Sequence, residues 1–312
     1  MSRQPPAPQP KIAMVIPCHN EASTIGTMVK QARKLLPDAE IVVCDNASDD
    51  ATAAVAAKAG ATVLHEARKG KGHAVRRLFY GVDADIYVMM DGDGTYDMAV
   101  LPKLLEQFRR ERLAMLVGTR VETKQDCYRS NHRWGNQAFN LALRVLFGSR
   151  FCDVFSGYRI FSRGFVKSFA TDSGGFTIES AMTVHALELR AACAEVPTAY
   201  GARPAGSVSK LSTWRDGLRI LLYISALFAR ERPLACYGLL AGMLALLATG
   251  LFVPVLQTYL ATGLVPRFPT LIVAGCMGLA AVVCVVAGVI LQSIAHTRRE
   301  AKQLACMAAQ RF

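Results

Sequence analysis

Two acidic side chains, Asp91 and Asp93, directly follow the apolar run 86–90 and flank a single glycine. An apolar run of this length predicts a buried strand, so both carboxylates would stand at its C-terminal end. Carboxylate oxygens are the ligands that hard divalent cations such as Mg²⁺ and Mn²⁺ prefer. The pattern therefore predicts a site that holds a cation against a diphosphate. For this segment taken alone, a solvated Asp-Gly turn is the alternative.

Short apolar runs alternate with stretches of helical pattern through the first third of the chain. The predicted strands cover residues 12–16, 40–44, 62–64 and 86–90, and the predicted helices cover 23–36, 50–59 and 72–82. This βαβαβαβ order predicts an α/β fold with a mostly parallel, doubly wound, Rossmann-like sheet. Ligands of such sheets bind at the C-terminal ends of the strands.

Polar side chains gather at two more of these strand ends. Pro17, Asn20 and Glu21 follow the first strand, and Asp45 follows the second. Because parallel strands end at the same edge of a sheet, we expect both groups to lie near Asp91. A helix N-cap is the alternative role for Asp45. The chain has no GxGxxG or Walker loop, which argues against a dinucleotide dehydrogenase or a P-loop ATPase.

The last quarter of the chain is apolar. Residues 233–266 and 268–295 contain no charged side chain, and a membrane-spanning helix needs about 20 apolar residues. These runs predict two transmembrane helices, at about 234–258 and 270–294, joined as a hairpin. Buried helices of a soluble core are the alternative.

Positive charge flanks this hairpin on one side. Arg230 and Arg232 precede it, and Arg298, Arg299 and Lys302 follow it. The positive-inside rule then predicts a multi-pass protein of the inner (cytoplasmic) membrane, with its N-terminal domain and both termini in the cytoplasm. The predicted parts are a disordered lead at 1–10, a catalytic domain at 11–211, a juxtamembrane interfacial helix at 212–232, the membrane hairpin at 233–296 and a cytoplasmic tail at 297–312.

The composition limits the kinds of molecule that the chain is expected to bind. A net charge of +12 suits anionic lipid headgroups in a chain with a membrane hairpin. No nucleic-acid recognition module is legible, so nucleic acid is not an expected partner. The nine cysteines are odd in number and contain no CxxC pair, which favours reduced thiols and predicts no zinc site.

Six motifs occur in order along the chain. They are residues 15–21 (VIPCHNE), 43–48 (VCDNAS), 68–72 (RKGKG), 91–93 (DGD), 153–159 (DVFSGYR) and 203–211 (RPAGSVSKL). With the terminal hairpin, they make the chain resemble family 2 glycosyltransferases of the GT-A fold. The resemblance is to the polyprenyl-phosphate sugar transferases, which include dolichol-phosphate mannose synthase and bacterial GtrB-type glucosyltransferases, and it covers nearly the whole chain.

This resemblance implies an enzyme that moves one hexose, with inversion, from a nucleotide-sugar such as UDP-glucose or GDP-mannose to a polyprenyl phosphate such as undecaprenyl phosphate. The role implied is in cell envelope glycosylation. The implied nucleotide-sugar residues are Pro17, Asn20, Glu21, Asp45, Arg68, Lys71 and Asp91. Asp91 and Asp93 would hold Mg²⁺ or Mn²⁺. The acidic motif continues into Gly94-Thr95, where the mannose synthases carry Leu-Gln, so Thr95, Asp97 and water remain candidates for the third ligand.

An acceptor phosphate is already anionic, so its site needs positive charge more than a strong general base. Arg120 follows the apolar run 113–117 and is the first candidate, and Arg133 in the basic, apolar segment 128–147 is the second. The resemblance places Arg203, Ser207 and Lys210 near the donor diphosphate or the lipid phosphate, with Arg203 among the catalytic residues beside Asp91, Asp93 and Asp153. Asp153 and Glu179 could orient the acceptor or the sugar, with Asp153 preferred and pairing with Arg159 as its alternative.

Two other functions fit parts of the pattern. A polysaccharide synthase of the same fold would usually have more membrane spans and a Gln-x-x-Arg-Trp motif, whereas here Arg133-Trp134 lacks the leading Gln. A non-catalytic scaffold that binds nucleotide or lipid would not need the Asp91 and Asp93 pair. Small residues in the first span, Gly238, Gly242 and Gly250, would support packing in a homo-oligomer.

Overall fold

The computed structural model describes residues 10–122, 141, 151–170, 178–201, 226 and 228–310. The described residues belong to two compact units. One lies within Met1–Asp216 together with Ala301–Phe312, and the other lies within Gly217–Glu300. We call the first the catalytic unit, after the catalytic domain that the sequence predicts, and the second the hairpin unit.

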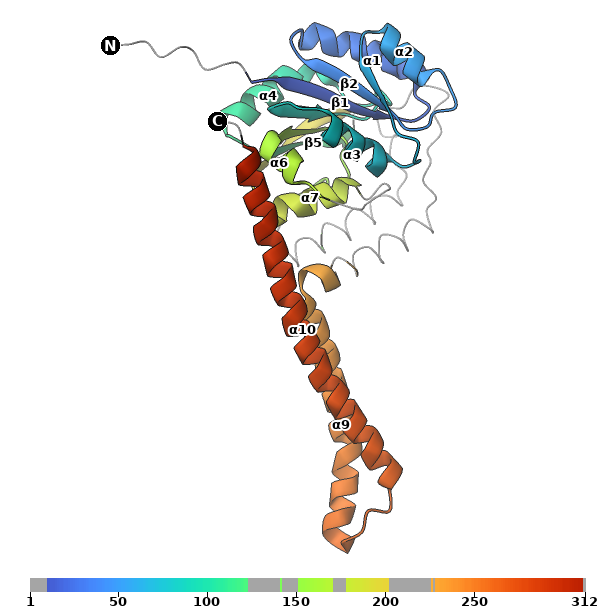
Figure 1. Ribbon diagram of the computed structural model, residues 1–312, viewed down its shortest axis with the longest axis vertical. Helices are drawn as coiled ribbons and strands as arrows, with labels where there is room; N and C mark the ends of the chain where they lie inside the picture. The colour runs from blue at the N-terminus through green and yellow to red at the C-terminus, as the bar shows by residue number, and fades with distance from the viewer. Residues whose placement is uncertain are drawn as a thin grey trace, which may run out of the picture. The chain divides into compact units, whose positions relative to one another are not determined.

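A seven-stranded sheet forms the centre of the described part of the catalytic unit (Figure 1). The strands are β1 Ile12–Cys18, β2 Glu40–Asp45, β3 Thr62–His65, β4 Ile86–Met89, β5 Met115–Glu122, β6 Arg159–Ser162 and β7 Cys193–Tyr200. Their order in the sheet is β3-β2-β1-β4-β6-β5-β7. Among these strands, β6 alone runs antiparallel to its neighbours, β4 and β5. The predicted mostly parallel α/β fold is confirmed.

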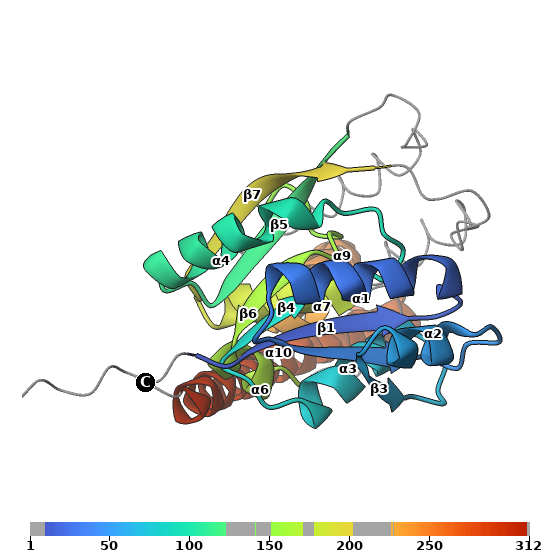
Figure 2. The ribbon, with the colours of Figure 1, turned by 90° about the horizontal axis from the view of Figure 1, so that it is seen from above.

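Helices cover both faces of this sheet (Figure 2). They are α1 Ala22–Leu35, α2 Thr52–Lys58, α3 Lys71–Gly81, α4 Leu101–Arg110, α6 Arg163–Ser168 and α7 Ile178–Glu188, with a short 3₁₀ turn, η1, at Met98–Val100. The helices α1, α2 and α4 share one apolar core with the sheet, and α3, α6 and α7 share the other. In β1, Met14 and Ile16 face the first core while Ala13 and Val15 face the second, as the alternation of a strand requires.

The second strand ends one residue later than its apolar run. Asp45 is the last residue of β2, and α2 begins only at Thr52 after Ala51 as its N-cap residue. Asp45 therefore does not cap α2. Its carboxylate instead stands at the C-terminal edge of the parallel strands, where ligands of such sheets bind.

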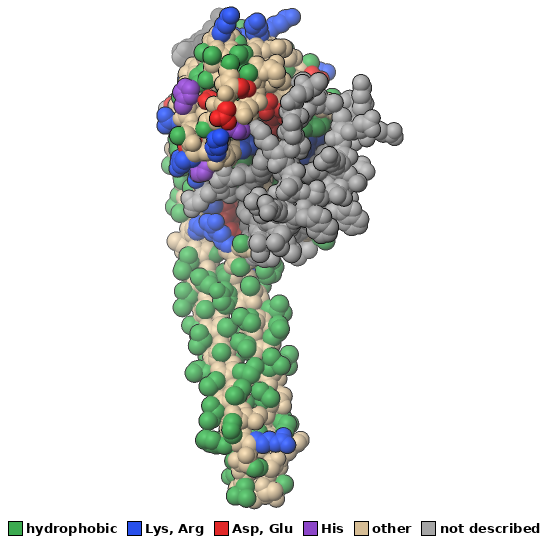
Figure 3. All heavy atoms as spheres, turned by 90° about the vertical axis from the view of Figure 1, so that its right-hand side faces the viewer, with side chains coloured by type: hydrophobic (Ala, Val, Ile, Leu, Met, Phe, Trp, Pro, Cys, Tyr) green, Lys and Arg blue, Asp and Glu red, His purple; other side chains and the backbone are tan. Residues whose placement is uncertain are grey.

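The hairpin unit contains two long apolar helices, α9 Pro233–Thr262 and most of α10 Phe268–Ala309. Both are long and apolar enough to cross a membrane, and only 17% of the most apolar window of each is buried. Hydrophobic side chains cover both helices (Figure 3). So little burial argues against helices of a soluble core and supports membrane association. The helix α10 continues through most of the segment predicted as a tail.

Small residues line the seam between α9 and α10. The buried residues of α10 are Ala274, Ala281, Gly288 and Ala295, and those within α9 include Ala241, Ala248 and Val255. A seven-residue spacing keeps one stripe of each helix facing the other, and small side chains let the backbones approach closely. A Cβ added at Gly288 would lie 3.1 Å from the Cβ of Tyr237.

The glycines predicted to support an oligomer face elsewhere. A Cβ added at Gly238, Gly242 or Gly250 would meet nothing within 4 Å. These positions therefore do not contribute to the seam, and the homo-oligomer stays a prediction.

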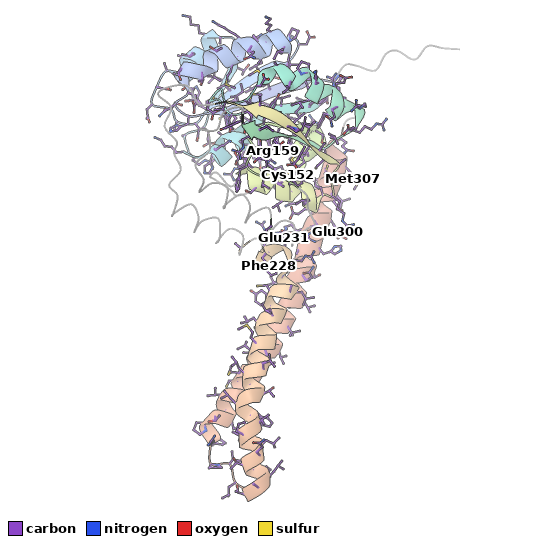
Figure 4. The ribbon with its side chains drawn as sticks, turned by 180° about the vertical axis from the view of Figure 1, so that it is seen from behind. Cys152, Arg159, Phe228, Glu231, Glu300 and Met307 are labelled. Carbon is purple, nitrogen blue, oxygen red and sulfur yellow. The ribbon has the colours of Figure 1, made fainter. Side chains whose placement is uncertain are left out.

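A buried ion cluster lies where the two helices of the hairpin unit meet, near the start of α9. The side chain of Glu231 is 2% exposed and pairs with Arg298 and Arg299, with 2.8 Å between its Oε2 and Arg299 Nη2 (Figure 4). A buried carboxylate requires charge compensation, so both arginines stabilise this end of the hairpin.

Candidate active site

Lys71 lies between two carboxylates at the C-terminal edge of the sheet. Its Nζ is 2.5 Å from Asp91 Oδ1, and it also forms an ion pair with Glu179. Burial would lower the pKa of Lys71, but the charges of Asp91 and Glu179 hold that pKa above its ordinary value. The ammonium group therefore stays charged. We call these three residues the Lys71 centre.

Three separate elements bring this centre together. Lys71 is the first residue of α3, Asp91 follows β4, and Glu179 lies in the first turn of α7. Negative charge is favourable at a helix N-terminus, so the first turn of α7 is a suitable place for an acidic side chain. Glu179 is only 3% exposed, and its Oε2 has no hydrogen-bond partner. The structure thus gives Glu179 a more central place than the sequence suggested.

Gly157 makes room for the Asp91 carboxylate. A Cβ added at Gly157 would collide with all three carboxylate atoms of Asp91. The backbone N–H of Gly157 donates to the Tyr96 hydroxyl at 2.8 Å, so the loop cannot easily shift away. The lack of a side chain at Gly157, in the motif at 153–159, therefore allows Asp91 of the acidic motif to take its position.

If Asp91 serves the predicted transferase reaction, we expect the Gly157→Ala substitution to lower turnover by at least about a hundredfold, because displacing a catalytic group by about 1 Å has an effect of this size. Gly201→Ala is the matched control, since a Cβ there would lie 3.7 Å from the Thr95 carbonyl oxygen, an ordinary contact. The measurement is turnover at saturating substrate, with melting temperature as the check on folding. Equal turnover in the two variants would contradict the role given to Gly157.

Asp93 is 5% exposed and holds the turn that follows it. Its Oδ1 accepts hydrogen bonds from the Thr95 backbone N–H at 3.2 Å and from the Thr95 hydroxyl at 2.7 Å. Asp97 accepts from the Ala99 backbone N–H at 2.8 Å and caps η1. Both protein candidates for a third metal ligand therefore have structural partners.

The donor atoms at Asp91 and Asp93 fit a particular kind of metal site. The described residues contain no group of three or more His, Cys, Asp or Glu side chains that could hold a metal ion. Mg²⁺ commonly binds one or two carboxylates and completes its shell with substrate phosphates and water. Asp91 and Asp93 are two carboxylates separated by one residue after a strand, and they fit a site whose metal shell is completed by the substrate.

Asp45 presents an unpartnered oxygen at the same edge of the sheet. It is 7% exposed, its Oδ1 is buried without a hydrogen-bond partner, and its Oδ2 lies 3.5 Å from His65 Nδ1. Pro17 is also buried and stands beside Cys44 in the strand register. A buried acceptor atom without a partner is costly unless a ligand satisfies it.

Asn20 and Glu21 connect two loops at this edge. Asn20 has a positive φ of 56°, and its Oδ1 accepts a hydrogen bond from the Asp49 backbone N–H at 2.8 Å. The backbone N–H of Glu21 donates to Thr52 Oγ1 at 2.8 Å. Both predicted residues thus lie at the site's edge, and the side chain of Asn20 holds the loop after β2.

Asn46 is a site residue that the sequence reasoning did not single out. Its Nδ2 donates to the Arg68 carbonyl oxygen at 2.7 Å, and its Oδ1 accepts from the Gly70 N–H at 2.7 Å. These bonds hold the basic loop that leads into Lys71. The position of an amide side chain next to Asp45 was the available signal.

The basic residues of that loop have different surroundings. Arg68 is largely exposed and bonds Glu66 through Nε at 2.9 Å. Lys69 is also exposed and lies 3.5 Å from Asp49, whereas the side chain of Lys71 is only 16% exposed. The structure therefore favours Lys71 over Arg68 as the charge that meets a bound anion.

Arg120 forms a two-pronged pair with Asp153. Its Nε and Nη2 donate to the two carboxylate oxygens at 2.8 Å each, and its backbone N–H donates at 3.1 Å. Burial would raise the pKa of Asp153, but Arg120 outweighs it and holds the pKa below its ordinary value. The guanidinium of Arg120 also lies 5.6 Å from the centre of the Tyr200 ring.

Arg159 has other partners than the Asp153 side chain suggested by the sequence. It is fully buried and donates to the carbonyl oxygens of Ser156 and Val154, at 2.9 and 2.6 Å, and to the Thr183 hydroxyl at 3.0 Å (Figure 4). Arg159 therefore connects α7 to the loop that contains Asp153. The remaining predicted site residues, Arg133, Arg203, Ser207 and Lys210, lie outside the described residues.

The model of the family described as "Glycosyl transferase family 2" matches residues 13–169, about half of the chain. This span contains all but the first residue of β1, the strands β2 to β4, the acidic motif and the loop at 153–159. The chain belongs to glycosyltransferase family 2. Glycosyltransferase AglJ of Haloferax volcanii, a relative, is 33% identical over 229 residues, which are 73% of this chain and 75% of the relative.

Two further likenesses concern ligands of other members of this fold. The undecaprenyl-phosphate mannosyltransferase of Micrococcus luteus is 28% identical over 216 residues, which are 65% of this chain and 88% of that protein. The crystal structure of glucosyl-3-phosphoglycerate synthase from Mycobacterium tuberculosis with Mn²⁺ and UDP-glucose aligns with a TM-score of 0.57 at 21% identity, over 72% of this chain and 79% of that one. The structural likeness shows the GT-A fold of the catalytic unit.

Proposed function

We propose that this family 2 glycosyltransferase moves a single hexose from a nucleotide-sugar to a polyprenyl phosphate, with inversion at the anomeric carbon. The observation that carries the proposal is the Lys71 centre, a largely buried cation between Asp91 and Glu179 at the ligand-binding edge of the sheet. The two apolar helices and the relative named for undecaprenyl phosphate support a lipid acceptor.

The donor side of the site is formed by Asp45, the Lys71 centre and Asp93. The unpartnered Oδ1 of Asp45 can accept a hydrogen bond from the base or the ribose. Lys71 supplies positive charge for the diphosphate. A bound Mg²⁺ or Mn²⁺, held by Asp91 and Asp93, would supply Lewis-acid stabilisation of the leaving nucleotide. A related fold binds Mn²⁺ together with UDP-glucose, which supports this choice of metal and donor.

The acceptor side is formed by Arg120, with Asp153 as the residue that orients it. A bidentate carboxylate fixes the plane of the guanidinium, so its remaining edge has a defined direction. The acceptor phosphate is anionic at neutral pH and attacks the anomeric carbon without a strong base. We propose Arg133, Arg203, Ser207 and Lys210 as the further phosphate contacts.

The proposed setting follows from the charge around the hairpin. Arg230, Arg232, Arg298 and Arg299 lie at one end of the two apolar helices. By the positive-inside rule, this end faces the cytoplasm, with the catalytic unit and both termini on the same side. Nucleotide-sugars would then reach the site from the cytoplasm, and a polyprenyl phosphate would reach it from the membrane.

The proposed function is tested by transfer from a panel of radiolabelled UDP- and GDP-hexoses to undecaprenyl phosphate, with the purified full-length protein. We expect one donor to give a lipid that carries a single hexose, and we expect EDTA to stop its formation, because the Asp91 and Asp93 oxygens suit a divalent cation. A long polymer would instead indicate a polysaccharide synthase. The absence of product with every donor would indicate a non-catalytic scaffold.

A further inference from the structure

The last part of α10 packs within the catalytic unit. Lys302 Nζ lies 2.5 Å from Glu188 Oε2 at the end of α7. A Cβ added at Gly164 in α6 would lie 2.8 Å from the Cys306 carbonyl oxygen, so the backbones of α6 and α10 approach closely there. Met307 marks this part of α10 in Figure 4. We call residues 301–310 the C-terminal segment.

The charge of Lys302 is matched to a buried carboxylate. The side chain of Glu188 is 2% exposed, and that of Lys302 is 16% exposed. His185 Nδ1 lies 4.0 Å from the same Glu188 oxygen, but burial, and then the charge of Lys302, lowers the pKa of His185 to about 3. The histidine is therefore neutral, and Lys302 supplies positive charge to the buried Glu188 carboxylate.

The helix α7 connects this ion pair to the candidate active site. It carries Glu188 in its last turn and Glu179, which pairs with Lys71, in its first. In its middle, the Thr183 hydroxyl accepts a hydrogen bond from Arg159, which in turn holds the loop that carries Asp153. Nearly every residue of α7 is buried, so the helix moves as one packed body. A shift of its last turn would therefore displace Glu179 as well.

We propose that Lys302 is a positioning residue, which acts through Glu188 and α7 to hold Glu179 against Lys71 and Asp91. The chain would thus complete its active site with residues of the last part of α10, beyond the apolar stretch of that helix. This proposal rests on the proposed function only where it is tested by transferase activity. The geometry of α7 is a separate readout.

Lys302→Ala is the first test, with Lys302→Arg as the conservative rescue and Glu300→Gln as the control on the same helix. Glu300 is exposed, and its Oε1 lies 3.3 Å from Nδ1 of His296, which is also exposed. We expect Lys302→Ala to lower turnover about tenfold and to leave the KM for the donor within about twofold, since a misplaced group affects the reacting geometry more than nucleotide binding. Lys302→Arg and Glu300→Gln should keep turnover within about twofold of the wild type. Wild-type turnover in Lys302→Ala would overturn the proposal.

Amide hydrogen exchange of residues 178–183 is the second test, and it does not depend on the substrate. We expect faster exchange there in Lys302→Ala and wild-type exchange in Lys302→Arg. Lys302→Ala/Glu188→Gln removes the buried charge, so its melting temperature should recover while exchange stays fast and turnover stays low. Recovery of turnover and exchange together with melting temperature would overturn the proposal, because Lys302 would then serve stability alone. If the wild type transferred no sugar at all, the proposed function would fail, and the exchange results would still decide the role of Lys302.

Discussion

Replacing Asp91 with asparagine should lower hexose transfer by about a thousandfold, the upper range for losing one group that stabilises charge in a transition state. Asparagine has nearly the same size as aspartate but carries no charge. The substitution therefore removes one of the two carboxylate partners of Lys71 and one of the two carboxylates proposed to hold the metal. The measurement is the initial rate of transfer to undecaprenyl phosphate, with circular dichroism and melting temperature as checks on folding.

Asp38→Asn is the matched control for this substitution. Asp38 is exposed in the turn between α1 and β2. This turn precedes the start of β2, whereas the candidate site lies at the C-terminal ends of the strands. We expect the rate of this variant to stay within about twofold of the wild type, since exposed substitutions away from a site have small effects. Transfer by Asp91→Asn at the rate of the control would exclude Asp91 from the reaction.

Lys71→Met should have the second largest effect, and it should affect both stability and transfer. The substitution leaves Asp91 and Glu179 close together without the cation between them. Removing one partner of a buried ion pair typically lowers the free energy of unfolding by about 3 kcal/mol. Loss of the charge proposed to meet the diphosphate should lower transfer by about a hundredfold. Denaturant unfolding and the transfer rate measure the two effects.

Two further variants separate these effects. Lys69→Met changes an exposed lysine of the same loop, so we expect little change in either quantity. Lys71→Met/Glu179→Gln removes a carboxylate together with the cation, so stability should recover in part while transfer stays low. If transfer recovered along with stability, Lys71 would have only a structural role, and the Lys71 centre could not be the donor site.

Much of the fold follows from local pattern. The apolar runs and the helical stretches between them place β1 to β4 and α1 to α3 within a few residues of where they occur. Periodicity is local, so a sequence can report it directly. The position of β6 between β4 and β5 is different, because it depends on pairing between segments far apart in the chain. No local pattern marks a strand as antiparallel.

The candidate site shows the same division. Asp91 and Asp45 could be chosen from the sequence because each follows a predicted strand, and Lys71 could be chosen because of the resemblance of the motif at 68–72 to family 2 glycosyltransferases. The ion-pair partners of the site residues could not be chosen from the sequence. The sequence reasoning assigned Arg120 to the acceptor alone and offered Arg159 as the partner of Asp153, whereas the structure pairs Asp153 with Arg120. Ion pairs between distant segments depend on how the elements pack, and the order of charges along the chain does not show this packing.

The ion pair of Glu179 with Lys71 is the clearest case. Glu179 lies in a helix whose residues are nearly all buried, and an acidic side chain in such a helix needs a partner. That need could be read from the sequence once the helix was known. The identity of the partner required the helix α7 to be placed beside the start of α3.

A comparison of two acceptors tests the central claim most directly. The purified protein would be given its preferred nucleotide-sugar with either undecaprenyl phosphate or undecaprenol, which has the same chain without the phosphate, and the lipid products would be weighed by mass spectrometry. We expect the phosphate lipid to gain the mass of one hexose and the alcohol to gain none, because the proposed acceptor site would bind an anionic nucleophile through arginine and includes no proposed base to activate a hydroxyl. Equal glycosylation of undecaprenol, or a ladder of added hexoses, would contradict the proposed function.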